Sequence, residues 1–539
     1  MINFQSTDSS GSSWVIVPKD WNSTPNVNSG TITQWSLVDT EDVVGVSQYF
    51  YQAYRFTYQS SGFFNMTIEF TMDTAALIID DRGIFFSPLI GFDYPASDGT
   101  AKVAFDSSLN VNSNKATAIG DFAYRPTQVS AHLAVFPLNE RLLRLQIEIT
   151  ANLPTEYTNL QSEDRIFNFD AVKRYATYAS SILNLYDRIY NNYTHLFNVT
   201  LTPPVEVQFF LPEFDEFLSV GGFTPFTEAG AGTININIFF IRAINGTIEV
   251  IAAHELVHHF LIKTGLSPNN FLWFHEGMSQ YISVSLVEKL GYQGATEEKN
   301  DLEQSSSQLI QHLGGQRFGF VQNWRPSDSQ SNVANYYVAS YYVVSRLAQD
   351  YDGPDYYQRF FELIHGITID NIDDLTLYLS KAANAPMALT LQDWGFSVID
   401  LYSSSDISEK IVETQKTIAA VSPVFQPYKF IAEFLYRQAL LSFEQGDIEG
   451  GTNLLQSATL MANLAPLLTL LTIAPIVGIV AYLLHRRSKK AKLKPPAPSV
   501  PSVPPPPPEI FGLQSSVSST ELFINLRSVL FCLLFDFFE

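Results

Sequence analysis

Residues 254–258 read His-Glu-Leu-Val-His, and residues 273–281 read Trp-Phe-His-Glu-Gly-Met-Ser-Gln-Tyr. In a helix, positions i and i+4 lie on one face, so His254 and His258 can direct both imidazoles at one metal ion. A catalytic zinc site takes three protein ligands and keeps a fourth position open. Glu276 is the natural third ligand. The two stretches therefore predict one Zn²⁺ ion held by two histidines and a glutamate.

The segment 247–263 is expected to form the helix that carries the first stretch. Thr247 suits its N-cap, and Gly265 followed by Pro268 ends it. A helix that is apolar nearly all round is buried, and burying ionisable side chains there is costly unless they are paired or bind a metal. Glu255, beside the first ligand, is placed to accept a proton from water. The alternative is a core helix with hydrogen-bonded histidines.

A second helix, over about 270–289, carries Glu276. The connector at 265–269 contains Gly, Ser, Pro and Asn, which allow the chain to fold back and bring the two helices together. His259 follows His254 by five positions and therefore points elsewhere on the first helix. We expect it to be structural or to support a ligand.

These residues resemble the gluzincins, the zinc peptidases that include thermolysin and the aminopeptidase N family. Residues 273–281 are similar to the W-x-x-E-G-x-x-x-Y stretch of the aminopeptidase N branch, although one residue fewer separates His258 from Glu276 here. The metzincin pattern is excluded, because Leu261 and Thr264 stand where it needs Gly and His. The resemblance implies a zinc-dependent peptidase with a thermolysin-like α+β domain, whose catalytic base is Glu255.

A downstream segment, 335–344, is similar to the family segment whose tyrosine hydrogen-bonds the tetrahedral intermediate. The resemblance assigns that role to Tyr337, with Tyr336 or Tyr341 as substitutes. The Lys and Gly that follow this tyrosine in the family are absent here.

The family's G-x-M-E-N motif, whose glutamate holds the free amine of the substrate, is missing. The corresponding stretch, 226–238, offers only Glu228 in its place. Residues 233–241 alternate like a strand, and in gluzincins an edge strand here binds the substrate backbone. We therefore expect endopeptidase or broad peptidase activity. The alternative is a zinc aminopeptidase in which Glu228 anchors the amine.

Charge and composition further narrow the class of protein. Residues 1–463 hold 25 of the 32 Lys and Arg and 50 of the 54 Asp and Glu, a net charge of about −25. Nucleic-acid binding is therefore not expected, since it depends on basic patches. Cys532 is the single cysteine, so no disulfide within the chain is possible.

Residues 464–484 carry no charge and span roughly 31 Å as a helix, enough for a bilayer core. Six Lys and Arg follow within 486–494, which places that end in the cytoplasm. Five N-x-S/T sequons agree with an outward-facing N-terminal part: Asn22, Asn65, Asn192, Asn198 and Asn245. The first residues do not read as a signal peptide, so we expect the native start to lie upstream.

The sequence thus predicts an α+β multidomain protein with one transmembrane helix. The expected parts are a β-rich domain at 1–162, a gluzincin-like catalytic domain with a helical C-terminal half at 163–410, a tetratricopeptide-like helical hairpin at 425–462, the span at 464–484 and a basic, Pro-rich cytoplasmic tail at 485–539. The expected function is hydrolysis of peptide or protein substrates at the outer face of the cell membrane. A catalytically inactive surface module and a different zinc hydrolase are the alternatives, and the oligomeric state is open.

Overall fold

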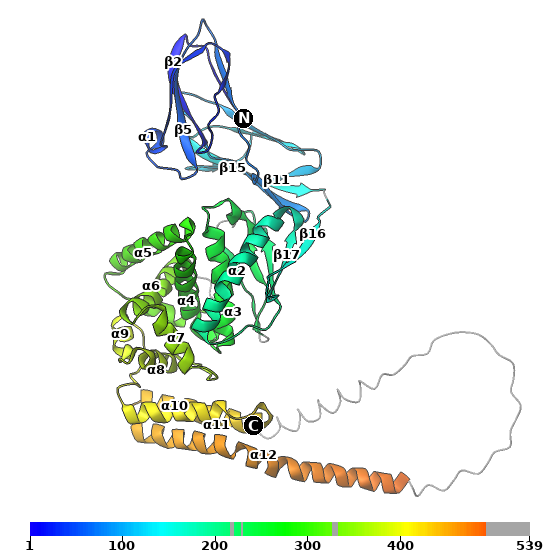
Figure 1. Cartoon of the computed structure of the whole chain (residues 1–539), viewed down its shortest axis with the longest axis vertical. Coiled ribbons are helices and arrows are strands. Elements are labelled where there is room, and N and C mark those ends of the chain that lie inside the picture. Colours follow the sequence, from blue (N-terminus) through cyan, green and yellow to red (C-terminus); the bar gives the residue numbers. More distant parts are fainter. Residues whose placement is uncertain (153, 216–219, 228–229, 326–331, 492–539) are drawn as a thin grey trace, which may run out of the picture. The chain divides into compact units, whose positions relative to one another are not determined.

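The computed structural model describes the chain except for residues 153, 216–219, 228–229, 326–331 and 492–539 (Figure 1). It divides into two compact units, Met1–Leu468 and Thr469–Glu539. The first unit runs from β-sheets through a mixed sheet into helices. The second unit contains the end of the last helix, and the predicted Pro-rich tail from residue 492 onward lies outside the described residues.

The N-terminal part is built from β-strands, as the sequence predicts. Their bounds are β1 Ile2–Ser6, β2 Ser10–Pro18, β3 Asn26–Ser29, β4 Thr31–Val38, β5 Tyr51–Gln59, β6 Phe64–Ile68, β7 Ala76–Ile79, β8 Arg82–Phe86, β9 Ile90–Gly91, β10 Thr100–Ala104, β11 Leu109–Ile119, β12 Ala123–Tyr124, β13 Gln128–Ser130, β14 Leu133–Pro137 and β15 Leu142–Ala151, with one short helix, α1, Glu41–Val44. The sheet orders are β1-β6-β3, β2-β5-β4, β10-β14-β13 and β12-β11-β15-β8-β7, with β9 on β15. Buried side chains alternate with more exposed ones along these strands: in β6, Phe64, Met66 and Ile68 are buried.

The next sheet begins earlier than the expected domain boundary at 162. Its strands are β16 Tyr157–Gln161, β17 Phe167–Val172, β18 Val205–Phe210, β22 Ile234–Asn237 and β19 Gly222–Phe223, in that order. Strand β16 pairs antiparallel with β17, while β17, β18 and β22 run parallel. The helix α2, Ala176–Phe197, connects β17 to β18. Strand β16 therefore belongs to this sheet, although it lies before the predicted boundary at 162.

The prediction of an edge strand at 233–241 is wrong. Strand β22 is flanked by β18 and β19, and the 3-10 helix η2, Ile238–Arg242, follows it directly. All four residues of β22 are buried. Asn235 and Asn237 made the strand look half-exposed, but their side-chain amides donate to the Thr233 and Val220 carbonyl oxygens, both at 2.7 Å. In the described residues, the outer strand on this side is β19.

The helical C-terminal half is confirmed. Its helices are α3 Thr247–Lys263, α4 Pro268–Lys289, α5 Gln293–Leu313, α6 Val333–Asp350, α7 Pro354–Leu363, α8 Ile372–Ala383 and α9 Met387–Asp393. Shorter elements accompany them, namely the paired strands β20 Phe226–Thr227 and β21 Gly230–Ala231 and the 3-10 helices η1 Lys173–Tyr175 and η3 Gly319–Asn323. One continuous hydrophobic core joins the mixed sheet to these helices, and it includes Leu77 of β7 as well as residues from Phe167 to Val398.

The last helices form a second core of their own. They are α10 Ser405–Ala419, the 3-10 helix η4 Pro423–Phe425, α11 Gln426–Glu444 and α12 Ile448–Ala491. The predicted hairpin end at 462 and the predicted span at 464–484 lie on one continuous helix, and the division between the two compact units falls after Leu468. Among the described residues, the α12 segment Ile448–Thr472 is long and apolar enough to cross a membrane, and 28% of its most apolar window is buried.

Candidate metal centre

Helix α3 carries the first two predicted ligands. It begins at Thr247, so the predicted N-cap is one residue off: Gly246 occupies that position with φ of +108°. A left-handed backbone of this kind favours glycine. The helix has apolar side chains on every face and packs against α2, α4 and β22. This burial holds His254 and His258, one turn apart, in fixed directions.

Helix α4 supplies the third predicted ligand. It begins at Pro268, two residues before the expected start, with Ser267 as N-cap accepting from the Asn269 amide. Gly277 follows Glu276, and a Cβ at Gly277 would collide with the Ser340 carbonyl oxygen of α6. Only a glycine therefore allows α6 to lie this close to the ligand position.

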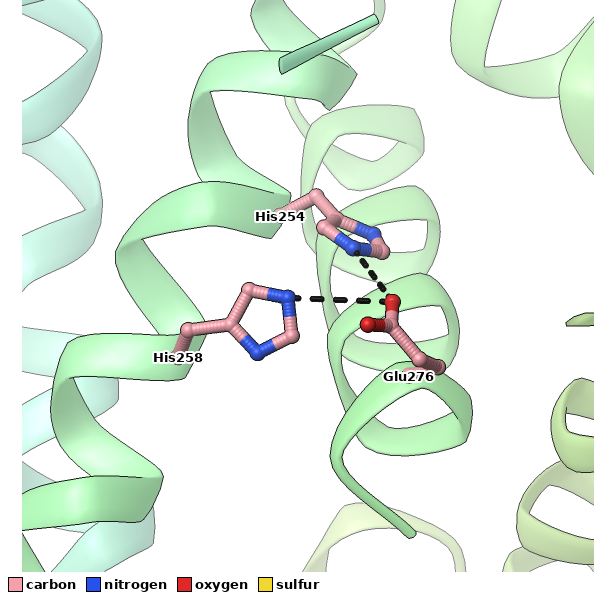
Figure 2. A group of neighbouring side chains, drawn as sticks. All are labelled: His254, His258 and Glu276. Atoms are coloured by element: carbon pink, nitrogen blue, oxygen red, sulfur yellow. Dashed lines mark hydrogen bonds and ion pairs between the residues drawn. The ribbon is translucent and has the colours of Figure 1, made fainter. Parts of the chain in front are cut away.

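The three predicted ligands converge (Figure 2). The Glu276 Oε2 atom lies 3.2 Å from His254 Nε2 and 3.7 Å from His258 Nε2. One donor atom from each residue lies within 4.8 Å of the others, although the residues come from two helices. Two imidazole nitrogens and a carboxylate oxygen are the donor set that zinc takes in catalytic sites with an open fourth position. The residues therefore fit a zinc ion.

The protonation states of the two histidines also favour metal binding. Burial holds the pKa of His258 well below its usual range, so its imidazole is neutral and keeps a lone pair for a metal. Burial also opposes the charged form of His254, but the hydrogen bond and charge of Glu276 outweigh it and raise the His254 pKa. A bound cation would take the place of that proton between the two side chains.

Other side chains fix the ring of His258. Its Nδ1 lies 3.4 Å from His275 Nδ1 and 3.4 Å from Ser279 Oγ, which leaves Nε2 facing Glu276. The His275 Nε2 atom lies 3.1 Å from the Leu266 carbonyl oxygen. His259 instead forms a backbone hydrogen bond with Gly232, and burial lowers its pKa to about 4. His259 is therefore outside the ligand set, as its helix position predicts.

Glu255 is buried beside the ligands. Burial raises the pKa of this carboxyl group to about 7. The Thr224 hydroxyl donates to Glu255 Oε2 at 3.0 Å, and the backbone of Gly222 lies so close that a Cβ there would be 2.9 Å from Glu255 Cγ. Sequence reasoning missed Thr224, because no motif relates the loop after β19 to a helix about thirty residues later. The Gly221-Gly222 pair was the available signal for a close backbone approach.

Tyr337 lies near the same carboxylates. The negative charge of Glu276, then burial and the charge of Glu255, raise the pKa of Tyr337 well above its usual value. Tyr337 is 40% exposed as a residue, and its ring packs edge-on against Trp324 at 5.1 Å. The pKa of Tyr341 is also raised, first by burial, but the nearby carboxylates are those of Glu303, Glu288 and Glu298. Of these two tyrosines, Tyr337 is the one whose pKa responds to the charges of Glu276 and Glu255.

A further carboxylate reaches the site from α5. The charge of Glu298 contributes to the raised pKa of His254, and the Gln280 Nε2 atom donates to Glu298 Oε1 at 3.0 Å. The negative charge of Glu298 therefore favours a positive charge on His254, whether a proton or a bound cation. Sequence reasoning had no signal for Glu298, because α5 has no ligand motif.

Glu228, the alternative amine anchor, lies outside the described residues. The strands on either side of it are described: β20 and β21 pair, and Phe226 of β20 packs edge-on against His258 at 5.5 Å and His275 at 6.1 Å. Phe226 is therefore anchored beside the ligands.

Comparisons with known proteins found similarity only to solved structures. No family model and no curated protein matches the sequence. Yeast LTA4 hydrolase in complex with Bestatin is 13% identical, with a TM-score of 0.29, over 77% of this chain and 65% of that one. An aminopeptidase N family protein from Idiomarina loihiensis is 11% identical, with a TM-score of 0.33, over 76% and 75%. Native yeast LTA4 hydrolase is 12% identical, with a TM-score of 0.27, over 80% and 69%.

The alignment thus spans less than two thirds of the first of these structures. One of these structures is described as an aminopeptidase N family protein. TM-scores near 0.3 do not decide the arrangement of the whole chain. The function proposed for this protein therefore rests on the geometry of the site.

Proposed function

We propose that the protein is a zinc metallopeptidase of gluzincin type. The observation that carries the proposal is the convergence of His254, His258 and Glu276, with a buried glutamate beside them that is not one of the three. Burying such a set is costly unless the side chains are paired or bind a cation.

The residues have distinct roles in this proposal. Bound zinc supplies a Lewis acid that polarises the scissile carbonyl and lowers the pKa of water. Glu255 accepts the proton of the attacking water and passes it to the leaving amine. A carboxyl group with a pKa of about 7 suits both transfers near neutral pH. Tyr337 keeps its proton because its pKa is raised, and it donates a hydrogen bond to the oxyanion.

We further propose a location at the outer face of the cell membrane, anchored by one helix. The long apolar stretch of α12 and the basic residues after it support this orientation. The sequons upstream are consistent with glycosylation on the same side.

For specificity we propose endopeptidase or broad peptidase activity. A strict aminopeptidase must pair the substrate's ammonium group with a carboxylate near the metal, since an unpaired buried charge is costly. The sequence offers Glu228 alone in place of the missing G-x-M-E-N motif. Glu228 as an amine anchor is the second candidate, because its place in the sequence corresponds to that motif.

Zinc content and cleavage of matched peptides test these proposals. The purified full chain should contain one zinc per chain and cleave N-acetylated and free peptides at similar rates. If acetylation stops cleavage and Glu228→Ala does the same, the protein is an aminopeptidase. If zinc binds but no peptide in a broad library is cleaved, the inactive-module alternative holds.

A further inference from the structure

His275, the residue before Glu276 on α4, is a buried histidine outside the ligand set. It is 0% exposed, and His258, which it faces, is 3% exposed. Bulk water does not reach either ring, so each ring nitrogen needs a partner within the protein. These partners decide which nitrogen of each imidazole carries hydrogen, because the hydrogen bond made by one ring nitrogen sets the state of the other.

The Leu266 carbonyl oxygen fixes the hydrogen of His275. This oxygen lies 3.1 Å from His275 Nε2, and a carbonyl oxygen can only accept a hydrogen bond. Nε2 therefore carries hydrogen. Among the described residues no carboxylate pairs with His275, and burial disfavours a charged ring that lacks such a partner. The ring is therefore neutral, and its Nδ1 keeps a lone pair.

This lone pair points at His258. The two Nδ1 atoms are 3.4 Å apart, the ring planes differ by 13°, and the ring centroids are 5.7 Å apart. The centroid separation exceeds the nitrogen separation by about two ring radii, so the line between the nitrogens runs within the plane of each ring. This edge-to-edge arrangement suits a hydrogen bond between the nitrogens, at the long end of the usual distance. His258 Nδ1 is then the donor and carries hydrogen.

The other nitrogen of His258 consequently faces the metal position without hydrogen. Its Nε2 lies 3.7 Å from Glu276 Oε2, which is too far for an ordinary N–H···O hydrogen bond, whereas His254 Nε2 lies at 3.2 Å (Figure 2). A lone pair that faces a carboxylate is favourable only when a cation lies between them. Zinc binds histidine through such a lone pair on a neutral ring.

Ser279 offers a competing arrangement. Its Oγ atom also lies 3.4 Å from His258 Nδ1, and a hydroxyl group can donate as well as accept. A hydrogen bond donated by Ser279 would move the hydrogen of His258 to Nε2, where it would block the metal position. It would also set the lone pairs of the two Nδ1 atoms against each other. The neutral ring of His275 therefore disfavours this arrangement.

We propose that His275 is a positioning residue for the metal centre, which holds His258 in the tautomer whose Nε2 lone pair is free for zinc. The relay runs from the Leu266 carbonyl oxygen through His275 to His258. His275 acts on the metal only through His258 and touches neither metal nor substrate. The inference rests on the proposed function, since it deepens the zinc site on which that function depends.

Zinc affinity of the purified full chain, measured by competition with a chelator, tests this role. His275→Leu removes both ring nitrogens and should weaken zinc binding by about 10–100-fold, the usual cost of losing the partner behind a histidine ligand. His275→Asn should restore the affinity to within a few-fold of the wild type, because its Oδ1 is an acceptor at the same number of bonds from the backbone as Nδ1. His275→Phe repeats the removal with an aromatic ring if leucine prevents folding.

Two further variants separate this role from general damage and from Ser279. His259→Leu is the matched control, since His259 also lies on α3 but hydrogen-bonds to the Gly232 backbone, and it should bind zinc like the wild type. Ser279→Ala should keep the wild-type affinity. The Tm of each metal-free variant reports damage to the fold, and it should not follow the order of the zinc affinities.

Unchanged zinc affinity in His275→Leu would overturn the proposal. A loss of affinity that asparagine does not restore would also overturn it, because the role would then be one of shape. A loss in Ser279→Ala that matches the loss in His275→Leu would assign the tautomer to Ser279 as much as to His275, with the same consequence. If the wild-type chain binds no zinc, the proposed zinc site and this inference both fail, whereas wild-type binding with unchanged His275 variants leaves the proposed function intact.

Discussion

The Thr224 hydroxyl lies 3.0 Å from Oε2 of Glu255 and donates a hydrogen bond to it. This contact joins the loop after the outer strand β19 to the buried carboxylate on α3. A hydrogen bond to a carboxylate favours its charged form, and it lowers the pKa of Glu255 against the effect of burial. Thr224 thereby positions the proposed base and adjusts the pH at which it is ready to accept a proton.

Replacing Thr224 with valine tests this role. Thr224→Val keeps the shape of the side chain but removes the donor, so the pKa of Glu255 should rise and the acid limb of the pH–rate profile should move to higher pH. Loss of a hydrogen bond to a charged group should lower kcat by roughly tenfold to a hundredfold near pH 6. Thr227→Val, an exposed neighbour on β20, is the control. An unchanged acid limb in Thr224→Val would contradict the role.

Glu255→Gln should keep zinc and lose turnover. Glutamine has nearly the same shape but cannot accept the proton, and general base catalysis contributes on the order of 10²–10⁴ in rate. Metal analysis should give the wild-type zinc content, since Glu255 lies outside the ligand set, while peptide cleavage drops by at least about a hundredfold. In contrast, Glu276→Gln should lose both zinc and turnover. Retained activity in Glu255→Gln would disprove the mechanism.

Glu298 should support zinc binding through His254. In Glu298→Gln, a negative charge near His254 is lost, so zinc affinity should fall by up to about tenfold, the lower end of the cost of losing a supporting carboxylate. Competition with a zinc chelator measures this directly. Glu297→Gln, the exposed neighbour on α5, is the control and should bind zinc like the wild type. Equal affinities in the two variants would show that Glu298 has no such role.

The free energy of unfolding should fall as pH rises from about 4 to about 7, because a buried acid between α8 and α11 must ionise. Burial raises the pKa of Asp374 to about 7 from 3.8, although Tyr436 and Asn371 hydrogen-bond to it, and burial raises that of its neighbour Asp373 to about 6. A raised carboxyl pKa means that the folded state binds the proton more tightly, so its contribution is complete below about pH 4 and lost towards pH 7.

The variant Asp374→Asn cannot ionise and should show a smaller drop in Tm between about pH 4.5 and pH 8 than the wild type. Asp370→Asn removes an exposed carboxylate that pairs with Arg437 at 2.7 Å, so it is the control for charge removal nearby. An identical pH dependence of Tm in Asp374→Asn and the wild type would rule out Asp374 as the titrating group.

Protease added to intact cells should remove residues 1–463 and spare the tail after residue 484. The six Lys and Arg within 486–494 motivate this topology, because basic flanks stay on the cytoplasmic side. Antibodies against the two ends would report which part survives. Protection of the N-terminal part with digestion of the tail would reverse the assignment.

Several parts of this protein depend on local spacing and could be predicted from the order of residues. The i, i+4 spacing of His254 and His258 on one helix face follows from helix geometry alone, and so does the separate direction of His259. The β-rich N-terminal region and the helical C-terminal half were likewise predictable from periodicity. Glu276 was predictable because a short connector links its helix to α3.

Contacts between segments that no motif relates could be known only from the folded chain. Thr224 and Glu298 reach Glu255 and His254 from separate elements, and only folding brings them together. The burial of Asn235 and Asn237 was hidden for the same reason: their partners are backbone carbonyl oxygens, whose positions depend on how the chain packs. Exposure of Phe430 and Phe434 also needed the fold, because hydropathy does not tell which apolar face of a helix the rest of the protein covers.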